Sequence, residues 1–302
     1  MSRIAYVNGR YLPIGAPAVP VEDRGLQFAD GVYEVVKVLG GRWIDLDRHL
    51  DRLERSLAAL AIPLPMSRAA LTGVIQETLR RNRLRDALVY LQIDRGVAPR
   101  NQLFSRDLRP SLIVTVRRLV LPLPAELAAG VGVVTAPDER WKRCDVKSVS
   151  LLANVLAKQR GADAGCREAW LYDAQGRVTE GSSSNAYIVD RNGRLVTRPL
   201  GPEILGGVTR SVVLELARGA GIEVVERPFT VAEAKQAREA FLTSTSSLVL
   251  PVTAIDGHPV ANGHPGPTTV LLLELYRRHL ADGTPPRPDR QATLAQKRRF
   301  GE

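Results

Sequence analysis

The pattern of apolar positions divides the first 120 residues into short strands and two helices. A helix is expected from Leu46 to Leu60, because leucines recur along one face at helical spacing and Pro63 follows. A second helix is expected over residues 67–82. Strands, which are rich in β-branched residues, are expected at 4–7, 31–39, 87–95 and 111–117. The sequence therefore predicts an N-terminal α/β domain at residues 1–120.

The pattern restarts after a Pro-rich stretch, Leu121-Pro122-Leu123-Pro124, whose composition is typical of a stiff spacer. We expect a linker at 121–130 and a C-terminal domain at 131–283. Its helices are expected at 150–160, with Gly161 as terminator, and at 209–220 and 268–280. Its strands are expected at 131–136, 168–172, 185–189, 195–198, 223–227, 239–243 and 251–255. Adjacent runs of strands with helices between them predict an α+β, or mixed α/β, chain of two domains.

Composition and charge narrow the class of protein. The chain is 44% apolar and lacks a run of 18 apolar residues, and its first residues are too polar for a signal peptide, so we expect a cytoplasmic globular enzyme without a membrane span. The net charge is +10, but basic and acidic residues alternate, as in Asp45–Arg55, which is typical of a solvated helix face and not of a nucleic-acid surface. The Pro-rich, basic segment 284–302 is expected to be disordered. No Cys or His spacing predicts a metal site.

Lys147 is one candidate for chemistry, because it lies at a strand-to-helix junction beside the cations Lys142 and Arg143. Nearby cations and burial favour the neutral amine that Schiff-base chemistry needs. A surface lysine that packs only its stem is the alternative interpretation. Lys37 is a competing candidate, since it shares a strand face with Tyr33.

Three further segments could bind a small anionic ligand. Thr179–Asn185 contains small hydroxyl residues and one acid, Glu180, and is either a ligand-binding segment or a polar turn. Gly201–Arg210 places glycines before a helix N-terminus, which is either a phosphate site or an ordinary capped helix. Thr243–Ser247 is a second hydroxyl cluster, at the end of a strand.

Taken together, these segments resemble the fold-type IV pyridoxal-phosphate enzymes, and most closely the bacterial D-amino-acid aminotransferases. The resemblance runs from about Tyr6 to Gly257. It is carried, in one order along the chain, by Glu22–Glu34, Arg143–Ser148, Leu156–Gln159, Thr179–Asn185, Ile204–Arg210 and Thr243–Ser246. It implies a small N-terminal domain, a larger barrel-like C-terminal domain and pyridoxal 5'-phosphate as the cofactor.

The resemblance also implies roles for residues at the cofactor end of the site. Lys147 matches the lysine that forms the Schiff base and shuttles the proton. Glu180 matches the acid that pairs with the pyridine nitrogen and keeps the ring an electron sink. The other matched cofactor contacts are Arg52, Val208, Thr209, Ser244 and Thr245 at the phosphate and Leu205 on the ring.

At the substrate end, the resemblance implies a tyrosine, an arginine and a histidine that hold the carboxylate, the last two from the other subunit of a homodimer. Tyr33 and Arg100 match the first two, but Gln102 stands at the histidine position. A neutral hydrogen bond contributes about 0.5–1.5 kcal/mol and a charged one about 1.5–3 kcal/mol. The expected loss is roughly 1–2 kcal/mol, or about 5–30-fold in carboxylate affinity.

The implied activity is a transaminase that exchanges the amino group between a D-amino acid, such as D-alanine, and a 2-keto acid, such as 2-oxoglutarate. An (R)-selective amine transaminase and an aminodeoxychorismate lyase of the same fold stay open as alternatives. A branched-chain aminotransferase is disfavoured, because Val32–Lys37 follows the D-enzyme pattern. A non-enzymatic basic binding protein, using Lys297–Arg299, is the distant alternative.

Overall fold

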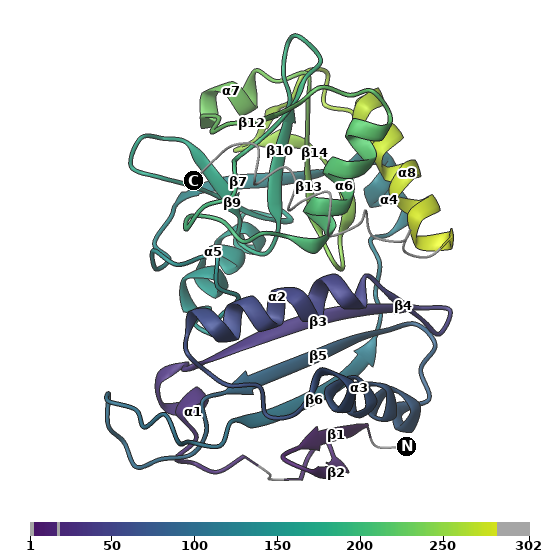
Figure 1. Ribbon diagram of the computed structural model, residues 1–302. Helices are drawn as coiled ribbons and strands as arrows, with labels where there is room; N and C mark the ends of the chain where they lie inside the picture. The colour runs from purple at the N-terminus through teal and green to yellow at the C-terminus, as the bar shows by residue number, and fades with distance from the viewer. Residues whose placement is uncertain (1–2, 17–18, 283–302) are drawn as a thin grey trace, which may run out of the picture.

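The computed structural model describes residues 3–16 and 19–282, which form two domains stacked one on the other (Figure 1). The strands of the N-terminal domain are β1 (Ile4–Val7), β2 (Arg10–Pro13), β3 (Gly31–Leu39), β4 (Arg42–Ile44), β5 (Ala87–Asp94) and β6 (Ser111–Arg118). They form a six-stranded antiparallel sheet in the order β2-β1-β6-β5-β3-β4. Its helices are α1 (Arg24–Phe28), α2 (Leu46–Ala59) and α3 (Arg68–Asn82).

Local sequence explains two features of this domain. The leucine stripe of α2 is buried, with Leu50, Leu53 and Leu57 exposed by only 2%, 1% and 2%, which confirms the helix predicted from their spacing. Gly40 and Gly41 join β3 to β4 with φ of +59° and +84°. A two-residue hairpin turn with left-handed backbone at both central positions favours glycine.

The C-terminal domain is larger and contains a mixed sheet. Its strands are β7 (Val131–Pro137), β8 (Glu168–Tyr172), β9 (Val178–Gly181), β10 (Asn185–Val189), β11 (Leu195–Thr197), β12 (Val224–Glu226), β13 (Glu239–Ser244), β14 (Leu248–Ile255) and β15 (His258–Pro259). The sheet order is β12-β11-β10-β13-β14-β7-β8-β9, with β15 paired to β14. Its helices are α4 (Pro124–Ala129), α5 (Leu152–Asp163), α6 (Val208–Gly219), α7 (Val231–Lys235) and α8 (Pro267–Asp282).

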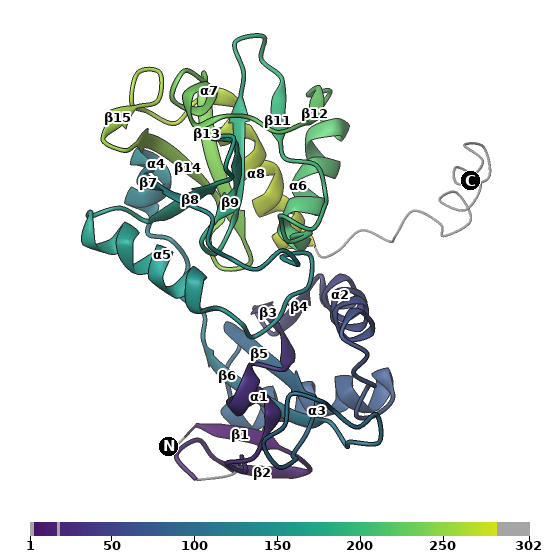
Figure 2. The same ribbon diagram turned by 90° about the vertical axis from the view of Figure 1, so that its left-hand side faces the viewer.

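This second sheet curls round on itself. The short turn 182–184 joins β9, at one end of the sheet order, to β10, near the other end. Helix α5 lies beside β7 and β8, and α6 and α8 pack near β13 (Figure 2). The curled sheet confirms the barrel-like C-terminal domain and the mixed α/β fold class that the resemblance implies.

Three local features differ from the sequence-based expectation. Gly161 does not end α5, which continues to Asp163. A Cβ at Gly161 would lie 2.6 Å from the carbonyl carbon of Glu168, so this glycine allows α5 to pack closely on β8. The expected linker at 121–130 contains α4, which begins with Pro124, a residue whose fixed φ suits a first helical turn. Part of the expected polar segment Thr179–Asn185 belongs to β9.

Polar contacts fix the two domains against each other where α2 lies between them (Figure 1). Arg48 of α2 forms a two-pronged ion pair with Glu215 of α6, with both N–O distances 2.8 Å. Asp45, which precedes α2, lies 3.2 Å from Nε2 of His279 on α8. The cleft between the domains is therefore bounded by elements that are tied together directly.

The described part of the chain holds no helix that is both long and apolar enough to cross a membrane. Over the same residues, no group of three His, Cys, Asp or Glu side chains could hold a metal ion. The predicted basic tail at 284–302 lies outside the described residues.

Candidate active site

A cavity of about 530 Å³ lies between the two domains and gathers residues from both. Its walls come from β3 and α2 on one side and from the β7–α5 connection, the 182–184 turn, the start of α6 and the end of β13 on the other. Of the predicted site residues, those that line it are Tyr33, Arg52, Lys147, Glu180, Leu205, Val208, Thr209, Ser244 and Thr245. The cofactor-binding residues inferred from the resemblance thus share one cavity with Tyr33.

Lys147 lies in the β7–α5 connection, half-buried at the cavity wall. Its backbone is held on both sides, because its carbonyl accepts from the Tyr33 amide at 3.0 Å and its amide donates to Oγ of Ser56 at 3.2 Å. The Nζ atom lies 4.0 Å from the centroid of the Tyr33 ring. A cation over an aromatic face is attracted by the ring quadrupole, so Tyr33 orients the amine while it is charged.

Arg52 of α2 is held at the cavity by a buried acid. Glu34 of β3 accepts from Nε at 2.7 Å and from Nη2 at 2.8 Å, and Nη1 donates to the Gly206 carbonyl at 3.0 Å. Nδ1 of His49 lies 2.7 Å from the same carboxyl. Burial raises the pKa of Glu34, but the charges and hydrogen bonds of Arg52 and His49 lower it further, to below its ordinary range. Glu34 is therefore ionised, and Arg52 keeps two of its five N–H donors for an anion in the cavity.

The start of α6 forms the other half of this anion site. The first amides of a helix lack partners within the helix and attract negative charge. Gly207 caps α6 without a side-chain hydrogen bond, so no side chain of the cap occupies these amides. A Cβ at Gly207 would collide with Oδ1 of Asn185, so only glycine fits there. The cavity-lining residues Val208 and Thr209 therefore present N–H donors, as a phosphate requires.

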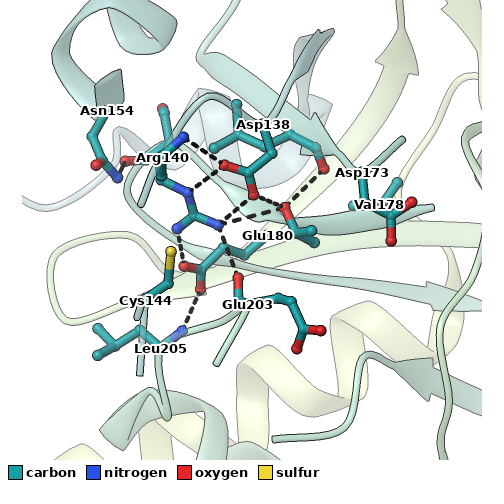
Figure 3. Close-up of polar contacts among 12 residues, drawn as sticks. Asp138, Arg140, Cys144, Asn154, Asp173, Val178, Glu180, Glu203 and Leu205 are labelled. Atoms are coloured by element: carbon teal, nitrogen blue, oxygen red, sulfur yellow. Dashed lines mark hydrogen bonds and ion pairs between the residues drawn. The ribbon is translucent and has the colours of Figure 1, made fainter. Parts of the chain in front are cut away.

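Glu180 of β9 is a buried acid at the opposite side of the cavity. Its Oε2 accepts from Nδ2 of Asn185 at 2.9 Å and from the Leu205 amide at 3.1 Å. Its Oε1 pairs with Arg140, which also lies 2.7 Å from Oδ2 of Asp138 (Figure 3). Burial raises the pKa of Glu180, and the Arg140 charge offsets part of that rise. The group is therefore poised to share a proton with a basic nitrogen.

Arg140 and Asp138 are residues around Glu180 that the sequence analysis did not single out. Arg140 is 5% exposed, and it bridges Glu180 and Asp138 while donating to the Glu203 carbonyl at 3.0 Å (Figure 3). Thr179 adds a hydrogen bond of 2.7 Å to Asp138. The available signal was an Asp-x-Arg pair directly after strand β7, and such a pair cannot be distinguished from a surface ion pair by its local sequence.

The other predicted positions lie outside the cavity. Lys37 is 1% exposed, and among the described residues its Nζ has no hydrogen-bond partner. Burial lowers the pKa of Lys37 to about 7, against an opposing effect of Asp45. Arg100 and Gln102 are exposed on the segment that follows β5, where the guanidinium of Arg100 lies 4.7 Å from the Phe28 ring centroid. That these two residues reach the site of another copy of the chain stays a prediction.

Comparison with known proteins agrees with this geometry. Residues 31–255 match the amino-transferase class IV family. The chain is 43% identical to the D-alanine aminotransferase of Bacillus licheniformis over 263 residues, which are 87% of this chain and 92% of that protein. A branched-chain aminotransferase of Thermoproteus uzoniensis, solved with norvaline, superposes with a TM-score of 0.83 at 28% identity, covering 93% and 96% of the two chains. A branched-chain amino acid aminotransferase of T.th., solved with pyridoxamine 5'-phosphate, gives 0.84 at 25% identity and coverages of 94% and 96%. The chain belongs to the class IV aminotransferase family, and it is an enzyme.

Proposed function

We propose that this enzyme moves amino groups between D-amino acids and 2-keto acids, with pyridoxal 5'-phosphate as its cofactor. The observation that carries the proposal is the single cavity in which an amine, a buried acid and an anion site face one another. The 43% identity with a D-alanine aminotransferase supports the D-amino-acid substrate class. The solved relative with pyridoxamine 5'-phosphate supports the cofactor.

The donor set of the cavity fits this cofactor at both ends. Arg52 and the amides of Val208 and Thr209 would hold the phosphate, and the hydroxyl groups of Ser244 and Thr245 would add further hydrogen bonds. Charge-assisted bonds of this kind contribute about 1.5–3 kcal/mol each. Leu205 supplies an apolar contact for the ring.

At the far end of the ring, Glu180 would hold a proton on the pyridine nitrogen. When bound, the cofactor supplies an electron sink for the electron pair released at the substrate Cα. Glu180 makes that sink effective only while it is ionised, because a neutral acid does not stabilise the pyridinium. Arg140 favours the ionised form of Glu180, because its charge offsets part of the rise in pKa that burial causes, and Asp138 in turn holds Arg140 in place.

Lys147 performs the proton transfer. Its Nζ would hold the cofactor covalently until an amino substrate displaces it, and the released amine would then take the proton from the substrate Cα as a general base. Contact with the Tyr33 ring orients Nζ, and the two backbone hydrogen bonds fix the segment that carries it. The amino group stays in the site when the keto acid leaves, and a second keto acid receives it.

A homodimer with shared active sites is part of this proposal. Exposed apolar side chains on α5, namely Leu152, Val155 and Leu156 at 72%, 57% and 60%, lie beside the cavity and would suit a subunit contact. Mixing Lys147→Ala with Arg100→Ala tests the shared site. Hybrid dimers then contain one intact site, and about a quarter of wild-type activity should return after subunit exchange. No recovery would show that Arg100 serves its own subunit or none.

Single-turnover spectra across substrates test the substrate class. The holoenzyme is mixed with D-alanine, L-alanine and (R)-1-phenylethylamine, and the cofactor absorbance is followed. Conversion with D-alanine but not L-alanine is expected, followed by glutamate formation on addition of 2-oxoglutarate. Preference for the (R)-amine would favour the amine transaminase, and pyruvate release from a chorismate-derived amine without an acceptor would favour the lyase.

A further inference from the structure

Asp94, the last residue of β5, fills a space between two glycines of the neighbouring segments. A Cβ at Gly25 of α1 would collide with Cγ of Asp94, and one at Gly31 of β3 would collide with its Oδ1. The Asp94 side chain is 1% exposed, and its neighbour Asp23 is fully buried. The backbone around Asp94 is therefore shaped to admit a carboxyl group.

Neither of these two acids has a cationic partner. Arg24 and Arg95 lie nearby, but both direct their Nε to Oδ2 of Asp30 at 2.8 Å. Across residues 3–16 and 19–282, no salt bridge joins a Lys or Arg side chain to Asp23 or Asp94. Asp23 instead accepts from the Gly25 amide at 2.8 Å and from Oγ of Ser111 at 2.5 Å.

The charge of Asp23 and a hydrogen bond with it both raise the pKa of Asp94, and a hydrogen bond between two carboxyl groups needs a proton on one of them. Burial and the negative charges of Asp23 and Asp30 raise the pKa of Asp94 to about 7, which assigns the shared proton to Asp94 below that pH. Asp94 is then the neutral acid that donates. Nε2 of Gln92 lies 2.8 Å from each oxygen of Asp94 and orients the group.

The acid pair connects to the substrate end of the site through Gln92. Oε1 of Gln92 accepts from the Tyr90 hydroxyl at 2.6 Å, and the Tyr90 ring stacks on Tyr33 with centroids 5.5 Å apart and an interplanar angle of 27°. Three side chains of β5 thus lead from Asp94 to the cavity wall. A displacement of Asp94 would be passed to Tyr33 through this chain.

The same pair supports the segment that bears Arg100 and Gln102. Asp23 forms an antiparallel bridge with Val97, and the Arg24 amide donates to the Gly96 carbonyl at 2.9 Å. Nη1 of Arg24 donates to the Asn101 carbonyl at 2.6 Å. The start of α1, which Asp23 caps, is therefore hydrogen-bonded to the 96–102 segment at several points.

We propose that Asp94 is a positioning residue for substrate carboxylate binding, because it fixes Tyr33 in the site of its own subunit and, with Asp23, the 96–102 segment that would reach the site of the other subunit. The inference rests on the proposed function, because it presumes a substrate carboxylate held by Tyr33, Arg100 and Gln102.

The proton-sharing pair has a consequence for pH dependence. Burial, together with the negative charges of Asp23 and Asp30, raises the pKa of Asp94 to about 7, against the opposing hydrogen bond from Gln92. The groups that face Asp94 are Asp23 and Arg24 from α1, Asp30 before β3, Tyr90, Gln92 and Arg95 from β5 and its end, and Ser111 from β6. As the pH rises through about 7, Asp94 loses its proton, two adjacent carboxylates repel, and the grip on the substrate carboxylate weakens.

The test compares Asp94→Asn, Asp94→Ala and the wild type as holoenzymes, with steady-state kinetics for D-alanine between about pH 6 and pH 9. Asparagine keeps a donor for Asp23 but cannot lose a proton there. We expect Asp94→Asn to keep a low KM over the whole range, whereas the KM of the wild type rises more steeply with pH. Asp94→Ala should raise KM about tenfold at every pH, with kcat and cofactor affinity within about twofold of wild type.

Asp107→Asn is the matched control, since Asp107 is an exposed acid in the β5–β6 connection, which begins directly after Asp94. It should follow the wild-type profile. If the KM of Asp94→Asn depends on pH as that of the wild type does, the inference is overturned. It is also overturned if kcat and cofactor affinity of Asp94→Ala fall by as large a factor as KM rises. A wild type without D-alanine turnover would overturn the proposed function itself, whereas normal wild-type turnover with either of the other results counts against Asp94 alone.

Discussion

Replacement of Glu34 by glutamine is the most informative single change to the cofactor end of the site. Glu34 is fully buried, and it receives two hydrogen bonds from Arg52 and one contact of 2.7 Å from His49. Glutamine preserves the shape of the side chain but removes its negative charge. The Arg52 guanidinium, only 6% exposed, is then a buried cation without a counter-charge.

The magnitude follows from the geometry of the pair. Removing one partner of a buried ion pair costs about 3–5 kcal/mol, because the other charge stays buried without compensation. Glutamine keeps one acceptor oxygen, so the lower end, about 3 kcal/mol, is expected for Glu34→Gln. That value corresponds to roughly a 150-fold change in the folding equilibrium. Cofactor affinity should fall as well, since Arg52 loses the contact that aims it at the cavity.

The assay is urea unfolding of the cofactor-free protein for wild type, Glu34→Gln, Arg52→Met and the double variant. Because the two residues interact directly, the double variant should be less destabilised than the sum of the single ones. Glu77→Gln is the control, since Glu77 pairs with Arg80 at the surface, where solvent screens the pair and little stability is lost with it. A loss below about 1 kcal/mol for Glu34→Gln, or additive single effects, would refute the reasoning.

The same pair predicts the sign of an acid effect. Burial raises the pKa of Glu34, but Arg52 and His49 together hold it below the ordinary value of 4.5. A carboxyl with a lowered pKa stabilises the folded state above its ordinary pKa and loses that contribution as the pH falls. The wild type should therefore lose stability below about pH 4.5 more steeply than Glu34→Gln.

Three further predictions concern the chemistry. Lys147→Ala should abolish the absorbance of lysine-bound cofactor in spectral titrations; a retained band would point to Lys37 instead. Arg140→Met should raise the pKa of Glu180 further, because the Leu205 amide then opposes its burial without the Arg140 charge. We expect kcat to fall about tenfold or more, while phosphate affinity, measured by inorganic phosphate competition, stays unchanged. An unchanged kcat would remove Arg140 from the site. Gln102→His should lower KM for D-alanine about 5–30-fold below the pH at which the new histidine loses its proton; an equal gain for (R)-1-phenylethylamine, which has no carboxylate, would contradict carboxylate binding at this position.

Elements with a strong local signal could be predicted from the sequence. The leucine stripe of α2 and the Gly40-Gly41 turn are each predicted by a pattern that spans only a few residues. Gly161 shows the limit of such signals: a glycine near a helix end is typical of termination, but here it serves close packing between α5 and β8. That distinction depends on a strand that the helix meets only in the folded chain.

Some residues of the candidate site could likewise be assigned from local sequence, and others could not. Motifs around Lys147, Glu180 and Thr209 could be assigned by resemblance, and the structure brings them to one cavity. Arg140 could not be found, because its partner Glu180 is 40 positions away and the pairing exists only once β9 lies beside the β7–α5 connection. The role of Asp94 was equally hidden, since it depends on three neighbouring segments and on the protonation of a buried pair.

Strand β3 limits how this site can change in evolution. In the proposed function, adjacent residues of the strand serve opposite ends of the ligand, because Tyr33 lies at the substrate side and Glu34 holds Arg52, which would bind the phosphate. A slip of one residue would move each of the two side chains to the opposite face of the sheet. Pairing with β5, unbroken from Gly31 to Val38, resists such a slip. New substrate sizes must therefore arise from walls other than β3. The exposed segment around Arg100 is the part of the N-terminal domain with the freedom to vary in length, and substrate range should diverge there first.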